Sequence, residues 1–131
     1  QAGVLSVKLK RLPAWNERRR QISARYDEAF KDLPGVSLVS VLPGNASARH
    51  HYVILVEERD TWVERLEQCG VATGIYYPTP LHLLPCYERL GYVMGDFPKA
   101  EWLASHHLAL PVFPERTDEQ VSHVVDSVKS L

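Results

Sequence analysis

The sequence predicts an α/β (α+β) fold: a two-layer sandwich in which helices cover a small mixed or antiparallel sheet, with a long N-terminal helix. Apolar residues recur at helical spacing over residues 1–33, and short strand-like segments interleave with helical ones after that. The first two strand-like segments are joined by the turn Pro43-Gly44-Asn45 instead of by a helix. A connection of this kind favours antiparallel pairing.

Composition and charge indicate one globular domain and argue against several classes of protein. The 131 residues are 45% hydrophobic and 24% charged, which is the range of folded domains. Fifteen Lys and Arg against sixteen Asp and Glu give a net charge of −1, which argues against a dedicated nucleic-acid binder. No apolar run reaches the roughly 20 residues of a membrane helix. With only two cysteines, we expect a cytoplasmic protein without nucleic-acid or membrane partners.

Residues 1–33 form the first predicted element, a long helix. Its apolar stripe runs through Leu5, Leu9, Leu12, Trp15, Ile22, Tyr26, Ala29 and Leu33. Pro13 is expected to kink or split this helix, and Pro34-Gly35 ends it. We interpret Arg18-Arg19-Arg20 as a solvated helix face. Because the chain opens at Gln1 without a capping residue, we expect the helix to continue a longer protein or to have lost a segment upstream.

Two strands and a helix are predicted next. Residues 36–42 suit a short strand, and residues 52–56 are apolar throughout, as in a strand covered on both faces. Thr61 and Glu64 have the spacing of a capping box, which predicts a helix that ends at Gly70.

Irregular and regular segments alternate in the second half of the chain. Alternating residues predict a strand over 71–77, and the three prolines of residues 78–85 then forbid both a ladder and a helix interior. The remaining predicted elements are a helical turn over 87–90, a helix over 98–107 that begins at Pro98, a strand over 108–112, and a final helix opened by the capping box Thr117–Gln120.

Residue spacing does not favour a metal site or a nucleophile. The adjacent pairs His50-His51 and His106-His107 would point to opposite faces of a strand, so neither chelates one ion easily. His82 and Cys86 are four residues apart, but Pro85 breaks the helix that would align them. No acidic residue follows within reach to orient the imidazole, so we interpret Cys86 as a small buried residue.

The proline-rich loop carries the most promising polar aromatic side chains. Tyr76, Tyr77 and His82 bracket this loop at the end of a predicted strand, a place where proteins often present polar groups to ligands. The alternative is that both tyrosines pack on the core with their hydroxyl groups satisfied. The residues themselves leave both interpretations open.

Six blocks of the chain carry a resemblance to a known family. They are residues 1–9 with 15–20, 70–87, 90–92, 95–101, 108–111 and 114–121. In this order they closely resemble the C-terminal part of the DegT/DnrJ/EryC1/StrS family, the sugar-nucleotide aminotransferases that use pyridoxal phosphate. The first block is similar to the long helix that joins the two domains of that family.

The resemblance implies that the chain is one part of a type I aminotransferase fold. Residues 1–33 would be the connecting helix and residues 34–131 the small C-terminal domain. In the family the large domain carries the lysine that binds the cofactor, so no catalytic or cofactor-binding residue is implied here. None of the five lysines is expected to bind pyridoxal phosphate: Lys8, Lys10, Lys31, Lys99 and Lys129.

Substrate contacts are implied at one loop. In the family, the Tyr-Pro-x-Pro-Leu-His loop approaches the active site at the subunit boundary. The resemblance therefore makes Tyr76, Tyr77, Pro78 and His82 the candidate substrate-binding residues.

The chain departs from the family pattern around this loop. Family members usually have His at the position of Tyr76 and Gln at that of Leu84. They usually have His-x-Tyr-His where this chain has Ser-Ala-Arg-His at residues 47–50. The second change removes two polar aromatic groups from the implied site.

Three hypotheses for function follow. The chain is expected to be the C-terminal domain or a fragment of a sugar-nucleotide aminotransferase, which moves an amine from an amino acid to a keto sugar nucleotide, and to be inactive alone. The alternatives are a stand-alone binding or interaction module with the same fold, and an accessory chain that completes a split transaminase. The apolar stripe of residues 1–15 should be covered by a large domain or by a second copy in a dimer.

Overall fold

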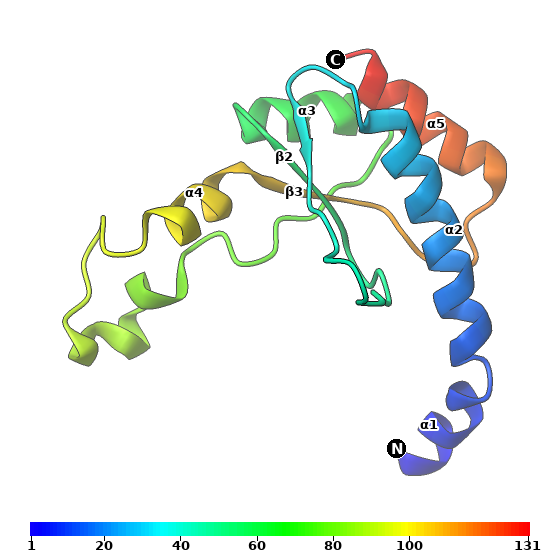
Figure 1. The fold of residues 1–131 in the computed structure, drawn as a ribbon, viewed down its shortest axis with the longest axis horizontal. Coiled ribbons are helices and arrows are strands. Elements are labelled where there is room, and N and C mark those ends of the chain that lie inside the picture. The colour runs from blue at the N-terminus through cyan, green and yellow to red at the C-terminus, as the bar shows by residue number, and fades with distance from the viewer.

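The computed structural model describes residues 1–131 and confirms the α/β class with a small antiparallel sheet (Figure 1). Its elements are α1 (Ala2–Leu9), α2 (Leu12–Phe30), β1 (Val36–Leu38), β2 (Tyr52–Val56), α3 (Arg59–Gln68), the 3₁₀ helices η1 (Leu81–Leu83) and η2 (Pro85–Leu90), α4 (Pro98–His106), β3 (His107–Leu110) and α5 (Asp118–Lys129).

The long N-terminal helix is split into α1 and α2, as expected. The break falls at Lys10 and Arg11, so that Pro13 occupies the first turn of α2. Proline is tolerated in a first turn because the backbone N–H that it lacks has no partner there. The split lets α1 leave the direction of α2 (Figure 1).

The sheet contains three antiparallel strands in the order β1-β2-β3. Val36 of β1 pairs with Val56 of β2, and Tyr52 of β2 pairs with Leu110 of β3. The central strand therefore brings the segment after residue 34 beside the segment after residue 106, which are far apart in the sequence.

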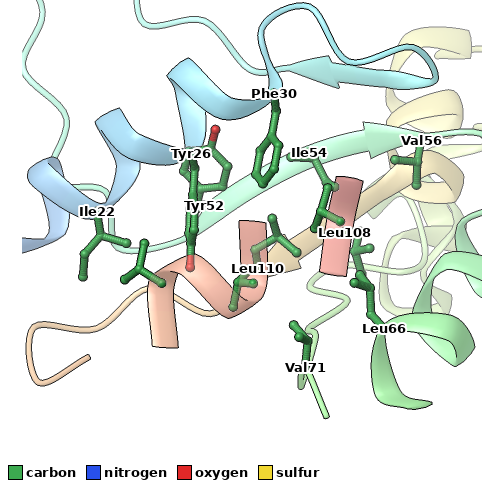
Figure 2. Close-up of a cluster of buried hydrophobic side chains, with 13 residues drawn as sticks. Ile22, Tyr26, Phe30, Tyr52, Ile54, Val56, Leu66, Val71, Leu108 and Leu110 are labelled. Carbon is green, nitrogen blue, oxygen red and sulfur yellow. The ribbon is translucent and has the colours of Figure 1, made fainter. Parts of the chain in front are cut away.

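Helices α2, α3 and α5 cover one face of the sheet and form the core (Figure 2). Burial alternates along β2, because Tyr52, Ile54 and Val56 are buried and the residues between them are half-buried. The expectation that β2 is covered on both faces is therefore wrong. The core consists of Ile22, Tyr26, Phe30, Tyr52, Ile54, Val56, Leu66, Val71, Leu108, Leu110, Val121, Val124 and Val128.

The predicted strand over 71–77 is wrong. This segment makes a single β-bridge, in which Gly74 exchanges two backbone hydrogen bonds of 3.0 and 2.8 Å with Ala109. Pairing does not extend beyond Gly74, and Tyr77 further along adopts a left-handed conformation, with φ of 61°. The strand predicted over 36–42 is likewise short, since its pairing with β2 ends at Leu38.

One of the two predicted capping boxes is present. At α5 the Thr117 hydroxyl accepts from the Gln120 N–H at 3.3 Å, and the Gln120 side chain accepts from the Thr117 N–H at 3.1 Å. The box predicted at Thr61 is wrong, because α3 already begins at Arg59, after Glu58 in a left-handed conformation. Thr61 therefore lies inside the first turn of α3.

The chain exposes far more surface than a compact monomer. Its accessible area is 8932 Å², whereas a folded monomer of 14.9 kDa exposes about 7,000 Å². Two parts project from the body, α1 and the segment with η1 and η2 (Figure 1). Both carry large exposed apolar side chains, including Val4, Leu5, Leu9, Leu90 and Met94. None of the helices has the length and apolar character to span a membrane.

Candidate functional site

A pocket of about 400 Å³ lies where β3 ends, and it gathers polar side chains from distant parts of the chain. Residues 72–76 and 109–113 form its walls, Arg19 reaches it from α2, and His50 and His51 reach it from the loop before β2. The β-bridge between Gly74 and Ala109 holds the two walls together.

Three aromatic rings form a column at this pocket, with planes tilted by 54° between His50 and His51 and by 37° between His51 and Tyr76. The ring centroids of His50 and His51 are 4.2 Å apart, and those of His51 and Tyr76 are 4.0 Å apart. Gly74 makes room for the last ring, because a Cβ there would lie 2.9 Å from Cε2 of Tyr76. The column therefore depends on a residue without a side chain.

The pocket holds one permanent charge, the guanidinium of Arg19, which also donates to the Asn16 side chain at 3.0 Å. Burial, followed by repulsion from His50, lowers the pKa of His51 below its usual value. One guanidinium beside aromatic rings can bind and orient a ligand through hydrogen bonds and stacking.

An ion-paired network anchors the loop that carries the two histidines. The Asp27 carboxylate accepts from Arg49 at 3.1 Å and from the Tyr52 hydroxyl at 2.8 Å. Burial, and then the hydrogen bond to Asp27, raise the pKa of Tyr52, so its hydroxyl remains a donor at neutral pH. Arg49 itself is left-handed, with φ of 48°.

His82 lies outside the pocket and forms a hydrogen bond with Glu101. Its Nε2 atom is 2.9 Å from Oε1 of Glu101, and the side chains of His82 and Glu101 are only 7% and 15% exposed. The expectation that no acidic residue lies within reach of this imidazole is wrong, because the fold brings Glu101 back from 19 residues further along the chain. The same carboxylate accepts from the backbone N–H groups of Gly95 and Phe97.

The four candidate substrate-binding residues are not brought together. Tyr76 lines the pocket, whereas Tyr77 and Pro78 are exposed beyond it and His82 packs against α4. The sequence did not predict three of the pocket residues, Arg19, His50 and His51. Arg19 was interpreted as part of a solvated helix face, and the two histidines as a pair that does not easily chelate one ion. No local pattern marks them, since long-range strand pairing brings them together.

Cys86 is exposed, so its interpretation as a buried residue is wrong. Pro85 and Cys86 open η2 on the projecting segment, which leaves this side chain without a core to enter. No group of three or more His, Cys, Asp or Glu side chains is arranged to hold a metal ion.

The residues present do not fit a pyridoxal phosphate site. The walls of the pocket contain neither a lysine for the cofactor aldehyde nor a carboxylate for its ring nitrogen. All five lysines are exposed and lie outside the pocket, and Lys31 is paired with Glu28 at 2.8 Å.

The fold is that of a family of aminotransferases. The chain belongs to the DegT/DnrJ/EryC1/StrS aminotransferase family, whose model matches residues 1–129. This confirms the family membership expected from the motif blocks.

Among curated relatives, the chain is similar to the erythromycin biosynthesis sensory transduction protein EryC1 of Saccharopolyspora erythraea. The two are 43% identical over 130 residues, which cover 99% of this chain and 36% of EryC1. The dTDP-3-amino-3,4,6-trideoxy-alpha-D-glucose transaminase of Streptomyces venezuelae is 34% identical over 129 residues, which cover 98% of this chain and 34% of that enzyme.

Solved structures show the same relation. The crystal structure of S. venezuelae DesV matches with a TM-score of 0.95 and 34% identity, over 99% of this chain and 35% of DesV. A family aminotransferase from Brucella abortus matches with a TM-score of 0.90 and 35% identity, over 99% of this chain and 34% of that protein. The chain thus spans about a third of the length of the relatives it matches.

Proposed function

We propose that this chain is the C-terminal, small domain of a sugar-nucleotide aminotransferase that uses pyridoxal phosphate. In the proposed parent reaction, an amine moves from an amino acid to a keto sugar nucleotide. The large domain supplies the cofactor lysine, and this domain supplies a wall of the substrate site. The chain alone does not transfer an amine.

One observation carries this proposal: nearly the whole chain matches the family, yet it spans only about a third of its relatives. The exposed surface supports it, because the area in excess of a compact monomer is about 1,900 Å². Each partner of a standard protein interface buries only about 800 Å². The lack of a lysine in the pocket agrees with a domain that holds substrate and leaves the chemistry to another part.

The pocket is the proposed contact surface for the sugar nucleotide. Arg19 can donate two hydrogen bonds to a phosphate or carboxylate group. The column of His50, His51 and Tyr76 offers ring faces against which a sugar or base can pack. In this proposal, Tyr76 keeps the substrate-binding role that its loop implies, and His82 shapes the loop through Glu101.

Helix α1, in which every residue is exposed, is the proposed interface for the isolated chain. Val4, Leu5, Val7 and Leu9 are each more than 60% exposed on one helix of eight residues. Water contact at an apolar stripe of this kind is unfavourable, so a second copy covers it in a two-fold dimer when no large domain does.

A chimaera tests the proposed function. The chain would replace the matched part of the S. venezuelae transaminase, and the fusion would be assayed for amine transfer to that enzyme's keto sugar nucleotide. Detectable transfer supports the proposal. A folded chimaera with bound cofactor and no transfer contradicts it and favours a stand-alone binding module.

A further inference from the structure

We propose that Asp27, Arg49 and Gly74 are positioning residues, which together hold the ring of His51 against that of Tyr76 at the pocket, with the ring centroids 4.0 Å apart and the planes tilted by 37°. The relevance of these residues to substrate rests on the proposed function. They extend that proposal because they are the residues that shape the candidate site. The positioning role is a matter of ring geometry, so it can be tested without an assay of amine transfer.

Unusual backbone conformations flank this column of rings. The chain has three residues other than glycine with positive φ, and two of them adjoin the column. Arg49, with φ of 48°, directly precedes His50, and Tyr77, with φ of 61°, directly follows Tyr76. Such conformations persist only where surrounding contacts hold them, and they cluster at ligand sites. The contacts around Arg49 must therefore hold its backbone in this conformation.

Asp27 supplies those contacts from α2, a helix that packs into the core. Its neighbours on α2, Tyr26 and Phe30, are fully buried, so the position of this carboxylate is set by the core. One carboxylate oxygen accepts from Arg49 at 3.1 Å and the other from Tyr52 at 2.8 Å. The loop is thus tied to α2 immediately before and immediately after the two histidines.

The Arg49 side chain and main chain are both engaged. Its guanidinium carbon lies 5.9 Å from the centre of the Tyr52 ring, and its backbone N–H donates to the Ser47 hydroxyl at 3.1 Å. The Arg49 side chain is only 21% exposed in this arrangement. Together with the ion pair, these contacts fix the left-handed turn that sends His50 and His51 into the pocket.

Gly74 fixes the other ring. A Cβ at this position would lie 2.9, 3.1 and 3.2 Å from Cε2, Cζ and the hydroxyl oxygen of Tyr76, so the ring lies directly against the Gly74 backbone. That backbone is held by two hydrogen bonds to Ala109. Gly74 does not have a positive φ, so alanine fits the backbone and only the Tyr76 ring has to move. The substitution G74A therefore displaces the ring selectively.

The test is an NMR measurement of the His51–Tyr76 contact in the isolated chain. The wild-type chain should show nuclear Overhauser effects between the two rings and upfield ring-current shifts. Both should be lost in R49A and in G74A and be weakened in D27N, while the methyl resonances of Ile54 and Leu108 keep their positions. The matched control E28Q, at the neighbouring carboxylate on α2, should leave the contact unchanged.

Two further variants separate positioning from a general loss of structure. In R49G, glycine adopts the left-handed conformation without strain but offers no guanidinium to Asp27. Loss of the ring contact in a folded R49G chain supports the anchoring role, and its retention overturns it. R49K keeps a cation for Asp27 and should restore the contact that R49A loses. Unchanged ring contacts in folded R49A and G74A would overturn the proposal as a whole.

Discussion

The imidazole of His82 lies 2.9 Å from the carboxylate of Glu101, and the pair joins η1 to α4. The same carboxylate accepts backbone N–H bonds from Gly95 and Phe97, so one side chain closes the whole projecting segment back on α4. The prediction that His82 contacts substrate stays a prediction, and in the structure its imidazole ties the loop that follows Tyr76 to α4.

The Glu101 cluster should make stability depend on pH. Burial favours a higher pKa for Glu101, but the N–H groups of Gly95 and Phe97 and the contact with His82 outweigh it, so the pKa is lowered below its usual value. A lowered folded-state pKa contributes stability above the carboxyl pKa of about 4.3 in the unfolded chain, and that contribution is lost as the pH falls further.

The variant E101Q removes this contribution. We expect a lower thermal midpoint than wild type at pH 7, a difference that shrinks below about pH 4, and faster amide exchange in residues 81–97. The exposed control E115Q should match wild type at both pH values. A difference between E101Q and wild type that does not depend on pH would contradict this account.

The capping box of α5 predicts a measurable loss of stability. Removing the Thr117 hydroxyl leaves the Gln120 N–H without its partner, so T117A should cost about 0.5–2 kcal/mol in chemical denaturation and leave the fold intact. T61A is the matched control, because Thr61 lies inside α3 and caps nothing. Equal losses in the two variants would mean that the box does not stabilise α5.

The buried Tyr26 hydroxyl predicts a second loss. It donates to the Pro111 carbonyl at 3.0 Å and so links α2 to a wall of the pocket. Y26F should cost about 0.5–1.5 kcal/mol in chemical denaturation. The control Y87F alters an exposed ring and should be near neutral. A neutral Y26F would show that water replaces this bond without loss.

Much of the fold could be predicted from local patterns. The apolar run over Tyr52–Val56 predicted β2, and the Thr117–Gln120 spacing predicted the start of α5. The alternating residues over 71–77 predicted a strand that the structure does not contain. Alternation describes only the side chains, whereas a strand also needs a partner for its backbone hydrogen bonds. That segment finds its partner only at Gly74.

The candidate site was harder to predict because its contacts are long-range. Arg19, His50 and Tyr76 meet at one pocket only after β2 and β3 have paired and α2 has packed on them. Glu101 reaches His82 in the same way, across a segment without regular strands or α-helices. Loop residues such as Tyr76 could be nominated from the sequence, but their partners could not.

Self-association should be visible in solution. The isolated chain should form a dimer in light scattering at high micromolar concentration, and L5E/L9E should convert it to a monomer by placing charges on the apolar side of α1. K8E is the matched control, because it changes the net charge by the same amount on the same helix and leaves Leu5 and Leu9 in place. A monomeric wild-type chain would contradict the interface on α1.

The most direct test of the central claim is a pyridoxal phosphate titration of the isolated chain and of the chimaera, followed by an amine-transfer assay on both. We predict one stoichiometric cofactor adduct and amine transfer for the chimaera. For the isolated chain we predict weak, unselective labelling of exposed lysines and no transfer. A single saturable adduct on the isolated chain, abolished by substitution of one of its five lysines, would contradict the claim that the chain supplies a wall of the site and not its chemistry.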